Sequence, residues 1–237
     1  MTREKYRHRL ERLREAVVAM GDLVRDRLAD ACTALYTGDR SLARDVVAGD
    51  DEIDDRYLEI EGECLDLLAL HQPVAGDLRF VAAAFKVVTD LERVGDLATN
   101  LAEYAMDATG SASPLPDVDF ERLTALALEL LDRAIEAFAT EDAAACFTVA
   151  DRDDELDARC ADVTDRVVRT LVELRCEATG ENAGRPRYGR DAPVRNVLAD
   201  VSRTLVVVRD VERVGDHAVN VAARTLYALE SDDELLA

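Results

Sequence analysis

An eleven-residue string occurs twice in this chain, and that repetition limits the folds the sequence can adopt. Asp90-Leu-Glu-Arg-Val-Gly-Asp-Leu-Ala-Thr-Asn100 returns as Asp210-Val-Glu-Arg-Val-Gly-Asp-His-Ala-Val-Asn220, with eight of eleven positions identical. A second pair of segments also repeats: Asp50-Asp-Glu-Ile-Asp54 and Asp153-Asp-Glu-Leu-Asp157. Recurrence of this kind is typical of duplicated structural units. The chain is therefore expected to contain two versions of one unit.

Apolar residues recur at steps of three and four over six long segments, which is the pattern of amphipathic helices. Leu10, Leu13, Val17 and Met20 illustrate it in the first segment. No alternation typical of strands is visible, so the predicted fold class is all-α. The expected helices cover residues 3–36, 41–70, 74–106, 120–140, 141–178 and 194–229.

Composition shifts mark the boundaries of the two expected units. A segment rich in Ser, Pro and Gly separates them, which is typical of a linker. The second unit has additional residues between its two acidic motifs, and we assign them to a Gly/Arg-rich loop that contains Arg185, Arg187 and Arg190. The expected organisation is a first unit over 1–107, a linker over 108–119, a second unit over 120–230 and a disordered tail over 231–237.

The chain is strongly acidic, with 50 Asp and Glu against 29 Lys and Arg and a formal net charge of −21. This charge excludes nucleic acid and anionic membranes as partners, because both require basic patches. Asp outnumbers Glu, and the lysines are Lys5 and Lys86. Such a composition is typical of proteins from halophilic organisms, since a Debye length of ~3 Å in molar salt screens the self-repulsion. An ordinary acidic protein is the alternative interpretation.

Cysteine usage and hydropathy predict a cytoplasmic protein. The five cysteines include no Cys-x-x-Cys pair, which favours free thiols in a reducing compartment. No apolar run approaches the ~18 residues of a membrane-spanning helix. The first ten residues lack the apolar segment of a signal peptide.

The repeated segments place pairs of acidic residues four positions apart. Side chains at this spacing share one helix face, where like charges destabilise an isolated helix by a few tenths of a kcal/mol. The repetition suggests a counter-charge, and clustered Asp and Glu oxygens suit Mg, Ca, Mn or iron. Asn100 and Asn220 continue the two faces as additional candidate ligands. The candidate metal ligands are Asp50, Asp54, Glu92, Asp96, Asp153, Asp157, Glu212 and Asp216.

Other interpretations of these residues are open. The acidic faces could be solvated, and Arg93 and Arg213 could pair with acids of a neighbouring helix and serve packing alone. Gly95 and Gly215 would then permit close helix approach. His217 could ligate a metal or be hydrogen-bonded in a packed interface. The sequence contains no nucleophile elbow, P-loop or His-Glu-x-x-His motif, so no catalytic residue is predicted.

One further segment, Gln72-Pro-Val-Ala-Gly-Asp-Leu-Arg79, together with the doubled Glu-Arg-Val-Gly-Asp, resembles the PhoU family of phosphate-signalling regulators. The resemblance implies two tandem three-helix bundles related by pseudo-two-fold symmetry. It also implies multinuclear iron or zinc clusters on the eight acidic residues above. The second unit lacks a counterpart of Pro-Val-Ala-Gly-Asp-Leu-Arg, so any role of Asp77 and Arg79 need not be shared.

The same resemblance implies a non-enzymatic regulator that restrains phosphate uptake. Its implied partners are the ATPase subunit of the phosphate ABC transporter and, where one exists, a sensor histidine kinase. A homodimer with membrane contact only through the transporter is also implied. Two alternatives stay open. A carboxylate-bridged hydrolase or oxidase is disfavoured because bundle di-iron sites use Glu-x-x-His, which this chain lacks. A metal-free helical scaffold is the other.

Overall fold

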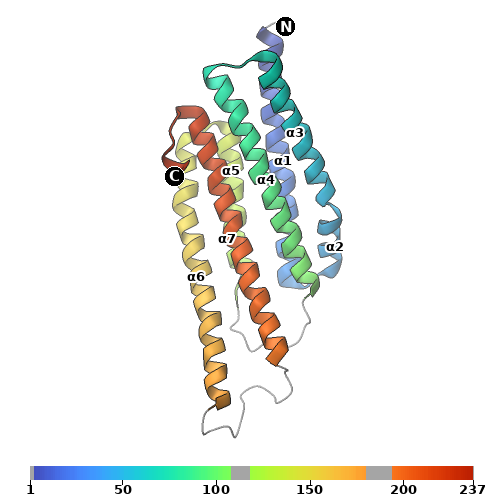
Figure 1. Ribbon diagram of the computed structural model, residues 1–237, viewed down its shortest axis with the longest axis vertical. Helices are drawn as coiled ribbons and strands as arrows, with labels where there is room; N and C mark the ends of the chain where they lie inside the picture. Colours follow the sequence, from blue (N-terminus) through green and yellow to red (C-terminus); the bar gives the residue numbers. More distant parts are fainter. Residues whose placement is uncertain (1–2, 108–117, 180–193, 237) are drawn as a thin grey trace.

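The structure is a computed structural model that describes residues 3–107, 118–179 and 194–236 (Figure 1). Most of the predicted linker and the Gly/Arg-rich loop lie outside these residues. The described part of the chain contains helices and no strands, so the all-α prediction is confirmed.

The first repeat has four helices where the sequence predicts three. A single helix over 41–70 was expected, and this prediction is wrong at Gly49, where the helix breaks. A Cβ at Gly49 would lie 2.7 Å from Cζ of Arg27, so the guanidinium group of Arg27 occupies the space that a side chain would need. Asp39 begins the shorter helix by accepting hydrogen bonds from two backbone amides. The helices are α1 (Arg3–Thr37), α2 (Arg40–Ala48), α3 (Asp50–His71) and α4 (Ala75–Asp107).

The second repeat has three helices close to their predicted bounds. Glu141 adopts a left-handed conformation with φ 57° and ends the first of them, so the next begins two residues later than predicted. The predicted disordered tail instead contains a short 3₁₀ helix, η1 (Glu234–Leu236), because Leu235 packs against the core. The helices are α5 (Phe120–Thr140), α6 (Ala143–Thr179) and α7 (Val194–Glu230).

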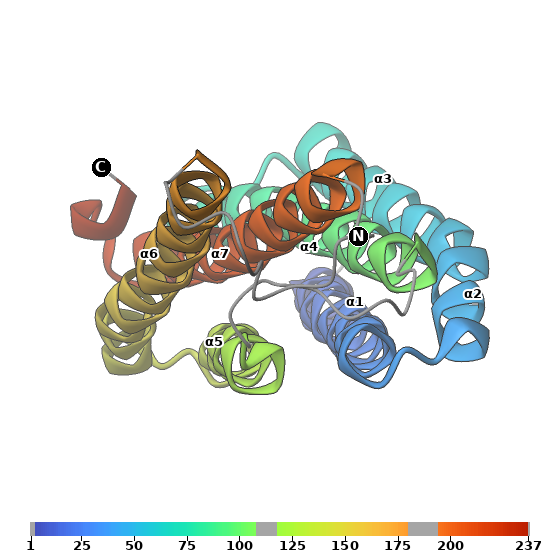
Figure 2. The same cartoon turned by 90° about the horizontal axis from the view of Figure 1, so that it is seen from below.

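The two repeats pack side by side as three-helix bundles in which α2 and α3 together take the place of one helix. Figure 2 shows α6, α7, α4 and α3 across one layer, with α5 and α1 beneath them. The repeats meet where α4 packs on α7 and where α1 packs on α5. Leu13, Leu91, Leu130 and Leu226 belong to one continuous core that joins both repeats. This arrangement confirms the predicted pair of bundles.

Free, buried thiols are found at Cys32, Cys64, Cys146 and Cys160. Burial raises the pKa of the Cys32 and Cys64 thiols to about 12. These groups therefore remain uncharged thiols at neutral pH. Within the described ranges, no helix is long and apolar enough to cross a membrane.

Candidate metal centres

The fold brings the acidic pairs of each repeat together on neighbouring helices. In the first repeat, α3 carries Asp50 and Asp54 and packs on α4, which carries Glu92 and Asp96. In the second repeat, α6 and α7 pack in the same way. We call these sets the first cluster and the second cluster. The members of the second cluster are Asp153, Asp157, Glu212 and Asp216.

The carboxylates of the first cluster repel one another across the α3–α4 contact. Burial raises the pKa of Glu92, and the charges of Asp96 and Asp54 raise it further. Burial also raises the pKa of Asp96, with added contributions from Asp50 and Asp54. The charges on α3 thus act on the carboxyl groups of α4. The first cluster is thus a joint feature of two helices.

The second cluster shows the same repulsion in a stronger form. Burial, followed by the charges of Asp157 and Asp216, raises the pKa of Asp153 to about 7. Burial and the Asp216 charge raise the pKa of Asp157. Burial, Asp157 and Asp216 do the same for Glu212. This cluster therefore holds a carboxyl group that ionises only near neutrality.

The two clusters differ in how their first aspartate is hydrogen-bonded. Thr99 Oγ1 on α4 donates a 2.9 Å hydrogen bond to Asp50 Oδ1. The corresponding residue of the second string is Val219, which has no donor. Asp153 Oδ1 is buried and has no hydrogen-bond partner. A buried oxygen without a donor is costly, so the second cluster contains an acceptor that the protein leaves unsatisfied.

A glycine on the third helix of each repeat allows the acidic helix to approach. A Cβ at Gly95 would lie 2.9 Å from Cδ1 of Ile53. A Cβ at Gly215 would overlap with Asp153 Oδ1 and lie 2.6 Å from Leu156 Cδ2. Both glycines therefore serve close packing, as expected, and Gly215 also makes room for the unsatisfied carboxylate.

Two arginines stand beside the carboxylates. The positive charges of Arg213 and Arg93 lower the pKa of Asp96, although burial and the neighbouring acids raise it overall. Arg213 comes from α7 of the other repeat, and its Nη1 lies 3.7 Å from Oδ1 of Asp210. These arginines relieve the repulsion in the first cluster only in part.

The sequence reasoning missed the residue that lies next to each cluster on the acidic helix. Tyr57 in the first repeat donates a 3.2 Å hydrogen bond to Glu61. The corresponding position of the second repeat is Cys160, whose Sγ lies 3.8 Å from the carbonyl oxygen of Val208. Burial raises the pKa of Cys160 to about 12, with Glu212 adding to the effect. The equal spacing of both residues from the repeated acidic segments was the available signal.

Asp90 and Asp210, the first residues of the two strings, are buried where the repeats meet. Asp90 Oδ1 lies 2.9 Å from Nδ1 of His217 and accepts a 3.3 Å hydrogen bond from Asn220. Asp210 accepts a 3.1 Å hydrogen bond from Tyr104 of the first repeat. Of the two interpretations of His217, the hydrogen-bonded one is confirmed. The amide group of Asn220 donates to Asp90, whereas Asn100 makes no hydrogen bond to the first cluster within the described residues.

The clusters have the composition of a site for a hard cation. Their donors are carboxylate oxygens, and the buried Oδ1 of Asp153 has no hydrogen-bond donor. In the described part of the chain, no three His, Cys, Asp or Glu side chains converge closely enough to hold a metal ion as they stand. Asp54, Asp96, Asp157 and Asp216 are exposed, so their side chains are free to move toward a cation. The type of donor atom therefore suits a hard cation, and whether enough donors reach one ion depends on the positions of these four side chains.

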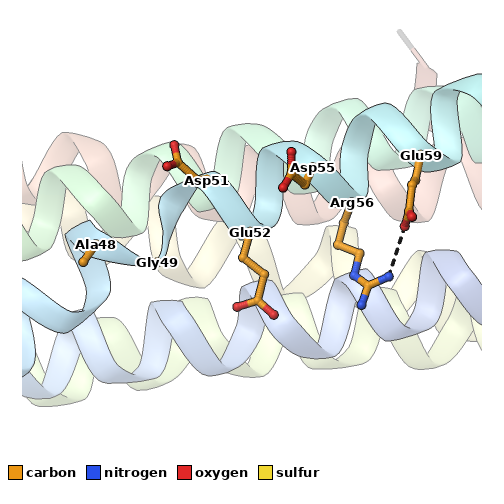
Figure 3. Close-up of a pocket in the computed structure, with 7 residues that line it drawn as sticks. All are labelled: Ala48, Gly49, Asp51, Glu52, Asp55, Arg56 and Glu59. Carbon is orange, nitrogen blue, oxygen red and sulfur yellow. Dashed lines mark hydrogen bonds and ion pairs between the residues drawn. The ribbon is translucent and has the colours of Figure 1, made fainter.

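A groove near these residues follows the start of α3. Figure 3 shows it from the α2–α3 break at Gly49 to Glu59, which accepts a 3.1 Å hydrogen bond from Arg56 Nη1. Neither Asp50 nor Asp54 lines it. The groove is therefore separate from the first cluster. Its lining residues are Ala48, Gly49, Asp51, Glu52, Asp55, Arg56 and Glu59.

Fold and site together define an all-α protein of two duplicated three-helix repeats, each with an acidic cluster between its second and third helices. The PhoU domain model matches this chain twice, over residues 17–105 and 120–225. These matches cover both repeats. The chain belongs to the PhoU family.

Relatives and solved structures agree with this assignment. The phosphate-specific transport system accessory protein PhoU homolog of Pseudomonas aeruginosa is 30% identical over 231 residues, which cover 97% of this chain and 87% of that protein. The homolog from Caulobacter vibrioides is 31% identical over 98% of this chain and 93% of its own length. The crystal structure of PhoU from Pseudomonas aeruginosa superposes with a TM-score of 0.79 at 29% identity, covering 96% of this chain and all of that one.

Proposed function

We propose that this chain is a cytoplasmic, non-enzymatic regulator that restrains phosphate uptake by acting on the ATPase subunit of the phosphate ABC transporter. The observation that carries the proposal is the pair of PhoU domains that spans both repeats, in a chain whose relatives are named as accessory proteins of phosphate transport. Where a cell has a phosphate-sensing histidine kinase, the same chain would couple transport to it. A homodimer is the proposed assembly.

The junction between the repeats supports an adaptor that acts as one body. Buried polar contacts cross it in both directions, from His217 to Asp90 and from Tyr104 to Asp210. Such contacts fix the register of two packed surfaces, because a shift would leave a buried carboxylate unpaired. A partner that binds one repeat would therefore sense the position of the other.

We also propose that each cluster holds a metal ion or a small metal cluster, with iron or zinc as the first candidates and Mg, Mn or Ca as others. The first cluster would use the four acids of α3 and α4, and the second those of α6 and α7. A bound cation would neutralise the mutual repulsion and tie the second helix of each repeat to the third. The carboxylates of this chain would position the ion, and Arg93 and Arg213 would remain beside it to contact an anionic partner group.

The imidazole and thiol groups nearest the second cluster do not favour the enzymatic alternative. Within the described residues, His217 is engaged with Asp90, and the Cys160 thiol stays protonated because its pKa is about 12. Neither group is available as a base or nucleophile beside the second cluster. A regulatory function needs no such group.

Phosphate uptake in cells that lack this chain tests the proposal. In phosphate-replete medium, uptake of labelled phosphate is expected to rise several-fold, and the wild-type chain should restore the low rate. A strain that also lacks the transporter ATPase subunit is the control, because the effect should vanish there. Unchanged uptake, or an equal rise without the ATPase subunit, would contradict the proposal.

A further inference from the structure

The outer face of α3 carries an exposed apolar stripe that no other described helix covers. It consists of Leu58, Gly62, Leu65 and Ala69, spaced by four, three and four, and we call it the outer stripe. Leu58 is 59% exposed and Leu65 is 53% exposed. Residues at this spacing lie on one side of a helix. The opposite side of α3 is the one that packs into the core.

Gly62 is unexplained by packing within this chain. Glycine in a helix interior weakens the helix relative to alanine. Gly21, Gly95 and Gly215 each have a neighbouring side chain within about 3 Å of the Cβ they lack, so close packing accounts for them. A Cβ at Gly62 would meet nothing within 4 Å. The space beside Gly62 is therefore available to another molecule.

Acidic groups frame the outer stripe. Asp51 and Asp55 continue it toward the N-terminus of α3, and Figure 3 shows both pointing to the same side of the helix, away from Glu52. Glu59 and Asp66 lie beside it and are exposed, and Asp66 is 4.0 Å from Nη2 of Arg9. Arg56 is also nearby, but it is bound to Glu59. The four acids outnumber the two arginines that pair with them, so the surface combines an apolar centre with a rim of net negative charge.

We propose that the outer stripe docks an amphipathic helix of a partner protein, whose apolar residues are flanked by Lys or Arg. The spacing of Leu58 and Leu65 around Gly62 matches the ridge-and-groove packing of two helices, and glycine lets their axes approach. The acidic rim favours a basic partner over a second copy, which would oppose acid to acid. The inference rests on the proposed function and deepens it, since an adaptor needs a docking surface.

The corresponding face of α6 explains why the surface belongs to the first repeat. Val168 and Val172 are exposed there, but Asp165 stands where Gly62 stands on α3. A charged side chain at that point blocks close approach of a second helix and replaces the apolar centre. The two repeats therefore offer different outer faces.

Two labelled amphipathic helical peptides of about 18 residues test the surface on the full chain. Both carry leucine on one face, and they differ in flanking the leucines with Arg or with Glu. Fluorescence anisotropy should show binding of the Arg peptide, weakened about tenfold or more by Gly62→Gln and by Leu58→Glu. Gly62→Gln should keep or raise the melting temperature, since glutamine favours helix more than glycine. Ala125→Gln, at an exposed position on α5, is the matched control and should bind like wild type.

Three outcomes would overturn the proposal. They are unchanged binding in both variants, equal binding of the Glu peptide, and self-association of the wild type that Gly62→Gln abolishes in sedimentation experiments. The last result would assign the stripe to a second copy. Because the peptide assay needs no transporter, its failure removes the docking surface alone, whereas failure of the uptake assay removes the proposed function.

Discussion

The first and second clusters occupy the same place in the two repeats, yet they treat their first aspartate differently. Asp50 is hydrogen-bonded to Thr99, whereas Asp153 Oδ1 is buried beside Gly215 without a donor. The substitution of Val219 for Thr99 accounts for this difference. The comparison shows that one duplicated scaffold can hold a satisfied cluster and an unsatisfied one. The second cluster has more to gain from a cation.

Replacing Gly215 or Gly95 by alanine adds one methyl group between two packed helices. The Gly215→Ala change should have the largest effect on the stability of the protein. Gly215→Ala forces Asp153 and Leu156 away, and overpacking of this kind typically costs about 1–3 kcal/mol. The melting temperature should fall by roughly 2–4 °C per kcal/mol. Gly95→Ala pushes only against Ile53 and should leave the hydrogen bond of Asp50 intact. Calorimetry of metal-free protein checks both, and a larger loss in Gly95→Ala would contradict the comparison.

Neutralising the first aspartate should act in opposite directions on stability and metal binding in the second repeat. Asp153→Asn removes a buried charge that its neighbours repel, so metal-free protein should gain about 1 kcal/mol. The same variant should lose metal from the second cluster. Asp50→Asn is the matched control and should not stabilise, because the charged acceptor of Thr99 is lost. Urea unfolding measures both, and destabilisation by Asp153→Asn would show that its oxygen is not in fact orphaned.

Exchanging threonine and valine between positions 99 and 219 should reverse the hydrogen bonding of the first aspartate in each cluster. Val219→Thr is expected to supply a hydrogen bond to Asp153 and to stabilise metal-free protein by about 0.5–1.5 kcal/mol. Thr99→Val should destabilise by a similar amount, since Asp50 would then resemble Asp153. Denaturant midpoints of the two single variants provide the measurement. If both changes have the same sign, Val219 is not the origin of the difference between the clusters.

The pH dependence of stability should also report the unsatisfied aspartate, with the smallest effect because Asp153 is only partly buried and water screens its charge. The pKa of Asp153 is raised to about 7 in the folded chain, against about 3.9 when unfolded. Ionisation then favours the unfolded state, so this contribution falls as pH rises from about 4 to about 7 and is constant above. The difference in unfolding free energy between wild type and Asp153→Asn should grow over that range at constant ionic strength. A flat difference would refute the raised pKa.

The helices were predictable because their apolar periodicity is long and regular. The break at Gly49 was not, since it depends on the position of Arg27 on another helix. The eight acids could be grouped by spacing alone, and the structure places the four of each repeat on two helices that pack together. The difference in hydrogen bonding between Asp50 and Asp153 could not be predicted from the sequence, because Thr99 and Asp50 lie on different helices. The high-salt adaptation inferred from composition stays a prediction.

The buried contacts between the repeats show a second limit of sequence reasoning. Asp90 lies at a position where the periodicity of α4 points to the core, and a buried aspartate is rare without a partner. Its partner, His217, comes from the other repeat, and no spacing within one string reveals it. Side chains that bridge duplicated units are therefore visible only once the units are placed together.

Elemental analysis of protein purified without chelator tests the central claim, that the two acidic clusters bind metal. Wild type is expected to carry metal at both clusters, Asp96→Asn and Asp216→Asn should each lose one cluster's share, and the double variant should be empty. Circular dichroism confirms that the variants remain helical. Metal-free wild type, or equal metal content in wild type and the double variant, would contradict the account.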